Sequence, residues 1–369
     1  MEDARLHSRG RLCHKKRGVS NSERDRLGQG KLQAPMAGAM KNRIGRLLNL
    51  FGPFFGLAFV YCFFLFYMDA ETRPDFCSLY NTKTIVTQAV IFGIGAIGMT
   101  PVIISAGIDL SVGSLVALAT VVTATVLKNY GGGDMGVWMP LWAAVAGIAA
   151  CTLCGFLSGV MISVLRIVPF IVTLGMMQIV RGAAKGISDQ ATVNCDPGWL
   201  GGLMVVEPRP GLWLSMAPGV WIMFILTALM FVVLRYTAFG RYVFAIGSNE
   251  ATARLCGVRV GRQRVWIYTV CGALTGVAGL MQFSNLTIGD PNAAGGMELD
   301  IIAAVIIGGG SFSGGEGSII GSIVGALIMA ILRNGCTLAE IPNWVQNIVI
   351  GAIIVIAVGL DRLKHARQA

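Results

Sequence analysis

The sequence predicts an all-α polytopic membrane protein with about ten transmembrane helices, several of them broken, and with its N- and C-termini in the cytoplasm. Of its 369 residues, 54% are hydrophobic and only 13% are charged, whereas soluble domains carry about 25% charged residues. Ten stretches contain no Asp, Glu, Lys or Arg, and several are long enough to cross a bilayer alone. This composition excludes a disordered chain and argues against a soluble enzyme.

The ten uncharged runs place the expected helices in order along the chain. A spanning helix needs about 20 residues, so the three short runs 167–180, 301–315 and 317–332 must borrow flanking residues or form broken helices. Glycines spaced four apart, as in Gly155-x3-Gly159 and Gly272-x3-Gly276, favour close helix packing. The runs are 47–68, 84–108, 110–127, 135–165, 167–180, 210–234, 265–289, 301–315, 317–332 and 341–360.

Basic residues are concentrated in two segments, and their distribution sets the expected orientation. Residues 1–50 hold 12 of the 29 Lys and Arg residues and 4 of the 19 Asp and Glu residues. The segment 235–264 carries six arginines against a single acid, Glu250. Because basic loops stay cytoplasmic, we place both segments and the tail 363–369 in the cytoplasm. We expect residues 1–46 to form a basic, disordered tail at the anionic bilayer surface rather than on nucleic acid.

The sequence lacks the residue groups that catalysis, metal binding or nucleotide binding require. Cys151-x-x-Cys154 lies in an apolar run without a strand pattern, and the three histidines lie near the termini. The G-x-G-x-x-G match at Gly93–Gly98 also lies in an apolar run, so we interpret it as a false match. We therefore expect no catalytic residue, no metal and no cofactor. Because no phosphate-binding loop occurs, any ATP must be bound by another chain.

The stretch Ser105–Ser114 contains an acidic residue between two apolar runs. An ionisable residue at membrane depth is costly and is by default a candidate for function. Asp109 or Ser111 also has a structural use, since either side chain can accept a free backbone N–H of the helix that continues through Val112. We favour this cap over direct contact with a solute, although a cap at a helix break also shapes any pathway beside it.

Two polar residues lie in the run that opens at Pro169. Thr173 and Gln178 are candidates for hydrogen bonds to a hydroxylated solute in a pathway, and either could instead tie one helix to another. We favour the tie between helices. We interpret Arg181, which follows this run, as an anchor at the membrane interface rather than a ligand.

The basic segment 235–264 contains the pattern of a short capped helix. Ser248 or Asn249 suits the N-cap, Glu250 the first turn and Gly257 the end of the helix. A capped helix on a basic loop between two spans is well placed to dock another molecule. An interfacial helix lying on lipid is the alternative, but the apolar residues of this helix are few, so we favour a protein partner.

Four motifs occur together along the chain. They are Ala106-Gly-Ile-Asp-Leu-Ser-Val-Gly113, Thr173-Leu-Gly175 with Arg181-Gly182, the stretch Ala245–Gly257, and Ile306-Ile-Gly-Gly-Gly with Ser313-Gly-Gly-x-Gly317. In combination they resemble the ribose/xylose/arabinose/galactose-type permeases of bacterial ABC importers, over roughly residues 45–362. The resemblance implies a multi-pass permease domain at residues 47–362 in the bacterial inner membrane, paired with a second copy or with a related permease.

The resemblance also implies partners and a role for the basic loop. A separate ABC ATPase docks on the cytoplasmic side, and a periplasmic sugar-binding protein docks on the other side. The loop 238–262 is then the coupling loop that contacts the ATPase. The resemblance further implies that the chain is a transport subunit for a monosaccharide and not an enzyme. The residues that the resemblance assigns to coupling are Gly247, Asn249, Glu250, Ala251 and Gly257.

Other transport functions fit the same predicted spans. The related permeases for branched-chain amino acids, or for another small solute, are one alternative. An ion-coupled secondary transporter is another, but it is expected to carry membrane-embedded acids or histidines. Asp109 is the one clear acid well inside the apolar region, and no histidine lies there. We therefore favour ATP-driven sugar import.

Overall fold

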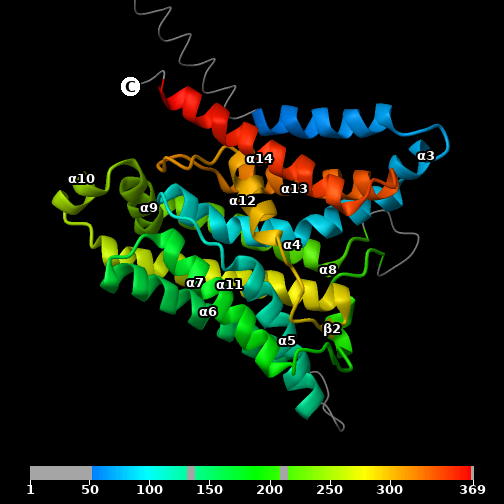
Figure 1. Ribbon diagram of the computed structural model, residues 1–369, viewed down its shortest axis with the longest axis horizontal. Coiled ribbons are helices and arrows are strands. Elements are labelled where there is room, and N and C mark those ends of the chain that lie inside the picture. The colour runs from blue at the N-terminus through cyan, green and yellow to red at the C-terminus, as the bar shows by residue number, and fades with distance from the viewer. Residues whose placement is uncertain (1–51, 131–137, 208–214, 367–369) are drawn as a thin grey trace, which may run out of the picture. The chain divides into compact units, whose positions relative to one another are not determined.

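The computed structural model describes residues 52–130, 138–207 and 215–366. These residues are almost entirely helical, in agreement with the predicted all-α membrane protein (Figure 1). The predicted basic tail, residues 1–46, lies outside the described residues, as do the last three residues of the predicted tail 363–369.

Within the residues that the structure describes, seven helices are long and apolar enough to cross a membrane. Each overlaps an uncharged run of the sequence. The short run 167–180 borrows flanking residues, because its helix continues past Arg181 and Lys185 to a length of 19 residues. The seven helices are α4 (Leu79–Ile104), α5 (Val112–Tyr130), α6 (Trp138–Leu165), α7 (Pro169–Ile187), α8 (Pro218–Tyr236), α11 (Val260–Leu286) and α13 (Ile319–Leu338).

The three remaining uncharged runs also fall on helices, but these are shorter or less uniformly apolar. They are the helix Gly52–Tyr67, α12 (Met297–Ile307) and α14 (Asn343–Ala366), of which Asn343–Ile356 is the apolar part. The 11 residues of α12 rise about 16 Å, or roughly half the hydrocarbon thickness. The structure therefore supports seven spans, and the full set of ten stays a prediction.

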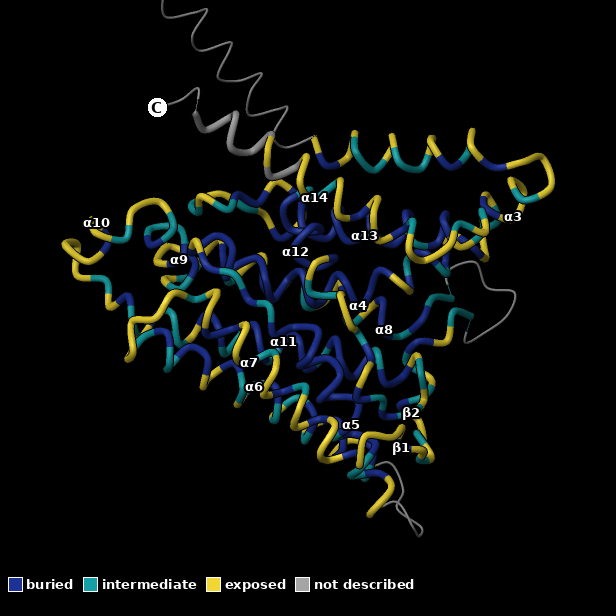
Figure 2. Tube along the Cα trace, viewed as in Figure 1, coloured by how far each residue is buried: buried dark blue, intermediate teal, exposed yellow. Residues whose placement is uncertain are grey.

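Helix α4 lies at the centre of the described residues and packs against α8, α11, α12 and α13. Its most apolar 18-residue window is 94% buried, compared with 28% for the corresponding windows of α6, α7 and α8. Figure 2 shows α4 mostly in the colour of buried residues. A helix that is apolar on all sides suits this position, whereas α6, α7 and α8 present broad apolar faces outward.

The predicted glycine pairs bring α6 and α11 together. A Cβ atom added to Gly155 would lie 3.0 Å from the Cα of Gly272, and the reverse distance is the same. An added Cβ at Gly276 would lie 2.8 Å from the Cα of Ile148. The two backbones are thus too close for larger side chains, as small-residue packing in membranes requires.

The helices run between two ends, which position the candidate sites. One end carries α9 (Ala238–Ser248) and α10 (Glu250–Leu255), and we name it the α10 end (Figure 1). At the opposite end, the β end, β1 (Val193–Asn194) pairs antiparallel with β2 (Ile288–Gly289). The short helices α3 (Arg73–Phe76), before α4, and η1 (Gly198–Gly202), after β1, complete the described elements.

Candidate functional site

The predicted short helix is present as α10, and both of its ends are capped by local contacts. The Asn249 side chain accepts a hydrogen bond from the backbone N–H of Thr252 at 2.9 Å. At the other end Gly257 has a φ of +84°, a left-handed conformation that glycine adopts without steric cost. The N–H groups of Gly257 and Val258 donate to the carbonyls of Arg254 and Ala253, which is the Schellman arrangement.

Glu250 ties α10 to the first turns of α11. Its Oε1 accepts hydrogen bonds from the Arg254 guanidinium at 2.6 and 3.1 Å, and its Oε2 accepts one from Arg264 at 2.5 Å. Partial burial acts to raise the pKa of Glu250, but the hydrogen bonds and charges of the two arginines outweigh it and hold that pKa below its ordinary value. Glu250 is therefore ionised at neutral pH and braces α10 against α11.

One face of α10 is held against the protein, and the other is free. Ala253 is buried and packs with Ile246 of α9 and Val260 of α11. Ala251 is exposed, and the Leu255 side chain is 89% exposed. A rigidly held helix thus presents an uncovered leucine to its surroundings.

Gly247, near the end of α9, lies against two segments that are distant in sequence. A Cβ atom added there would meet the carbonyl oxygen of Ile104, at the end of α4, and the backbone nitrogen of Gly315. The same Gly315 N–H donates to the Ile104 carbonyl at 2.8 Å. The α10 end of α4, α9 and the glycine-rich loop 308–318 are therefore joined through their backbones.

Asp109 occupies the break between α4 and α5 and is fully buried. Its Oδ1 accepts hydrogen bonds from the Ser111 backbone N–H at 2.9 Å and from the Ser111 hydroxyl at 2.6 Å. The Ser111 carbonyl in turn accepts the N–H of Leu115 and so begins α5. Asp109 therefore forms a side-chain turn with Ser111 just before α5 begins at Val112, whereas the predicted cap would accept an N–H of the helix itself.

Thr173, on α7, contacts the break between α4 and α5. Its buried hydroxyl donates to the Ile108 carbonyl at 3.2 Å, and the Tyr268 hydroxyl of α11 donates to the same oxygen at 3.4 Å. The structure thus brings Thr173 together with Asp109 and Ser111, in the role of a tie between helices. Gln178 lies elsewhere, on the exposed face of α7.

The exposed face of α7 carries an amide side chain and glycines that have free space next to them. A Cβ atom added to Gly175, Gly182 or Gly186 would meet nothing within 4 Å. Gln178 shares this face with Gly175 and Gly182, because residues three and four apart are neighbours on a helix. The face therefore leaves room for another molecule to approach the α7 backbone.

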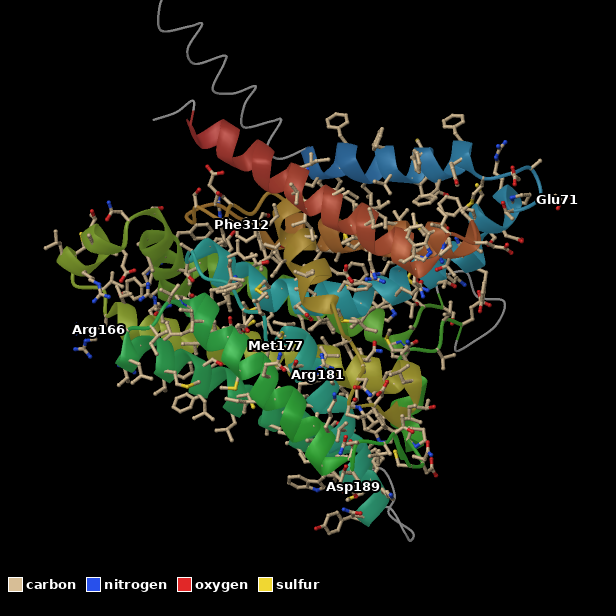
Figure 3. All side chains as sticks on the ribbon, viewed as in Figure 1. Glu71, Arg166, Met177, Arg181, Asp189 and Phe312 are labelled. Carbon is tan, nitrogen blue, oxygen red and sulfur yellow. The ribbon has the colours of Figure 1, made fainter. Side chains whose placement is uncertain are left out.

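Arg181 ties α7 to a segment that is distant in sequence, and its expected role as an anchor at the membrane interface stays a prediction. It lies within α7 between Arg166 and Asp189, which mark the two ends of that helix in Figure 3. Its Nη1 donates to the carbonyls of Pro291 and Ala293 at 3.1 and 2.8 Å. The guanidinium therefore fastens α7 to the segment that follows β2.

Sequence reasoning missed a polar cavity of about 350 Å³ toward the β end. A signal was available, because Thr84, Thr87 and Gln88 recur at the spacing of one helix face. The partners from other helices are far away in sequence and gave no such signal. The polar lining residues are Thr84, Thr87, Gln88, Gln282, Asn285, Arg333, Thr337, Asn343 and Gln346.

Comparisons with known proteins identify relatives. The family described as branched-chain amino acid transport system / permease component matches residues 81–358. The ribose import permease protein of Escherichia coli is 37% identical over 300 residues, which are 79% of this chain and 88% of that protein. The ribose import permease protein of Bacillus subtilis is 35% identical over 320 residues, 87% and 95% of the two chains.

A third relative has a different sugar in its name. The galactose/methyl galactoside import permease protein of Escherichia coli is 34% identical over 302 residues, 80% of this chain and 90% of that protein. No solved structure gives a significant match.

Proposed function

The chain belongs to the branched-chain amino acid transport system / permease component family, and from this premise we propose that its cargo is a monosaccharide. Membership makes the chain a multi-pass permease subunit of an ABC importer and not an enzyme. One observation carries the choice of cargo: the three relatives named for ribose or galactose import are at least 34% identical across at least 79% of the chain. Branched-chain amino acids, which the family description names, are the alternative.

The distribution of charge supports one orientation in a bacterial inner membrane. The segment 235–264 carries six arginines and includes α9 and α10. Because basic loops stay cytoplasmic, the α10 end faces the cytoplasm and an ABC ATPase chain, as do both termini. The β end then faces the periplasm and receives a sugar-binding protein.

The coupling element of this proposal is α10. It is the exposed, doubly capped helix of the basic loop, and its Leu255 side chain is 89% exposed. A coupling helix must fit a cleft in the ATPase and must also pass force to the membrane helices. The Glu250 ion pairs with Arg254 and Arg264 and the buried Ala253 support the second requirement, because they hold α10 on α9 and α11.

A continuous set of backbone contacts supports transmission from α10 to the helix break. Gly247 abuts the Ile104 carbonyl, and four residues later the Ile108 carbonyl accepts hydrogen bonds from Thr173 and Tyr268. A displacement of α9 therefore acts on the end of α4 and, through it, on the turn at Asp109. This turn lies between two spans and against α7.

We place the translocation pathway along the exposed face of α7, shared with a second copy of the permease. Gln178 is exposed there, and an amide facing hydrocarbon lacks hydrogen-bond partners and is costly. Opposite a second copy, the same amide lines an aqueous route and can bond sugar hydroxyls. The open glycines Gly175, Gly182 and Gly186 let the partner approach closely.

The test is reconstitution of the chain in proteoliposomes with its ATPase and binding protein. We expect ATP-dependent uptake of at least one of D-ribose, D-galactose and D-fructose, and no uptake of L-leucine. Uptake of leucine without any sugar would contradict the proposed cargo.

The docking role of α10 has its own test. Leu255→Glu should reduce recovery of the ATPase in a pull-down, because it places a charge on the exposed docking face. Leu299→Glu is the matched control, since Leu299 is 49% exposed but lies in α12, away from α10. Equal recovery by both variants would remove α10 from the interface.

A further inference from the structure

The polar cavity toward the β end draws its amides and its guanidinium from four helices. Gln88 comes from α4, Gln282 and Asn285 from α11, Arg333 from α13 and Gln346 from α14. Its volume of about 350 Å³ falls within the range of about 300–1,000 Å³ for small-molecule pockets. A cavity lined by several amides marks a candidate binding site, because polar groups taken out of water need hydrogen-bond partners.

One buried polar group of the cavity is unpartnered. The Thr87 side chain is 4% exposed, and its Oγ1 makes no hydrogen bond to any described residue. By contrast, the hydroxyl of Thr84, one turn earlier and also in the lining, donates to the carbonyl of Tyr80 at 3.0 Å. An unpartnered buried hydroxyl costs about 1–3 kcal/mol, so a ligand that hydrogen-bonds Thr87 recovers that cost.

The charge of the cavity is balanced. Arg333 is the one charged side chain among the lining residues, and its Nε and Nη2 both donate to Oδ2 of Asp300. The guanidinium also lies over the Phe92 ring, 5.8 Å from its centroid. Because a guanidinium has five N–H donors, Arg333 keeps donors for a ligand while its charge is neutralised by Asp300.

We propose that this cavity binds a neutral polyhydroxylated solute, and that it receives the sugar within the permease at the β end. The lining offers amides and hydroxyls that both donate and accept, which suits sugar hydroxyls. A zwitterionic amino acid would require separate sites for a carboxylate and an ammonium, and the paired Arg333 and Asp300 provide neither. No residue of α7 lines this cavity, so it is a receiving site within one protomer, separate from the pathway proposed along α7. This inference rests on the proposed function.

The first test compares a threonine of the lining with a threonine of α4 outside it. Thr87→Val removes the unpartnered hydroxyl, whereas Thr82→Val removes an exposed hydroxyl that already donates to the Ser78 carbonyl at 3.1 Å. At saturating sugar-loaded binding protein, Thr87→Val should slow sugar uptake roughly 2- to 13-fold, the effect of losing one neutral hydrogen bond. Thr82→Val should leave uptake near the wild-type rate, and ATPase stimulation should be unchanged in both. Equal uptake by the two variants would overturn the inference.

The second test measures binding without transport. Saturation-transfer NMR on the purified permease in nanodiscs should detect contact with D-ribose, D-galactose or D-fructose, but not with L-leucine. Gln282→Leu should weaken the signal of the bound sugar, and a folded Gln282→Leu protein with an undiminished signal would contradict the cavity as the site. Wild-type protein that imports sugar but gives no signal would refute the cavity while leaving the proposed function intact. Import of leucine alone would refute the proposed function itself.

Discussion

Replacing Gly247 by alanine tests the link between the coupling loop and the membrane helices. The added Cβ atom would collide with the carbonyl oxygen of Ile104 and the backbone nitrogen of Gly315. Neither obstacle is the end of a side chain that could rotate aside. The collision is relieved only if α9 moves away from the end of α4, which is the contact on which the proposed transmission depends.

The size of the effect follows from two opposing contributions. In a helix interior, alanine is favoured over glycine by about 1 kcal/mol. Forcing an extra carbon into a packed site costs about 1–3 kcal/mol, and backbone obstacles place Gly247 at the upper end of that range. The net cost is then about 1–2 kcal/mol, which corresponds to a factor of about 5–30 in an equilibrium.

The assay is sugar transported per ATP hydrolysed in proteoliposomes that contain the complete transporter. We expect Gly247→Ala to lower this ratio by about 5- to 30-fold, while the ATPase is still recovered in a pull-down, because α10 itself is unchanged. Gly351→Ala is the control, since a Cβ atom added to that helical glycine of α14 meets nothing within 4 Å. A wild-type ratio for Gly247→Ala would refute transmission through this contact.

Three further outcomes are expected. Asp109→Asn and Asp109→Ser should keep substantial uptake, because either side chain can still accept a hydrogen bond. Asp109→Leu should lower the yield of folded protein by removing this acceptor. If Asp109→Asn assembled normally but did not transport, the charge of Asp109 would have a role of its own. The ion pairs of Glu250 stabilise the chain above the ordinary Glu pKa of about 4.3, and this stabilisation is lost as the pH falls through the lowered pKa of the folded state. In thermal unfolding at pH 7, Glu250→Gln should therefore be less stable than wild type by about 0.2–1 kcal/mol per ion pair. Well below pH 4 the two proteins should be equally stable. A difference in stability that persisted there would contradict the ion-pair account. In a background without native cysteines, Asp196→Cys should react with an impermeant thiol reagent in intact cells and Arg259→Cys should not; labelling of Arg259→Cys would reverse the orientation.

Hydrophobic patterning predicted the helices because a bilayer leaves the backbone no other hydrogen-bond partners. Each of the ten uncharged runs overlaps a helix in the structure. The ends of the uncharged runs did not predict the ends of the helices where a charged residue forms hydrogen bonds inside the fold. Helix α7 continues past Arg181 because the guanidinium bonds the carbonyls of Pro291 and Ala293.

Local capping contacts of the candidate sites could also be predicted. The contacts of Asn249 and Gly257 lie within a few residues along the chain, so their residue types and spacing carry the information. Asp109 is also bonded locally, but to Ser111 just before α5 and not to an N–H of the helix. The contact from Thr173 to Ile108 joins residues 65 positions apart. Such contacts depend on which helices are neighbours, and hydrophobicity does not encode that choice. The polar cavity and the Gly247 contact could not be predicted from the sequence for the same reason.

The segment between Ile104 and Ile108 is where the separate parts of the candidate site meet. The Ile104 carbonyl is held by the Gly315 N–H, and the Ile108 carbonyl by hydroxyls from α7 and α11. Between them Ala106 has a φ of +59°, a conformation that costs a residue with a Cβ about 1–2 kcal/mol. A strained backbone persists only while its surroundings hold it. In the proposed transmission, movement of α9 against Ile104 would act on this strained segment, and the neighbouring contacts that hold it would have to change.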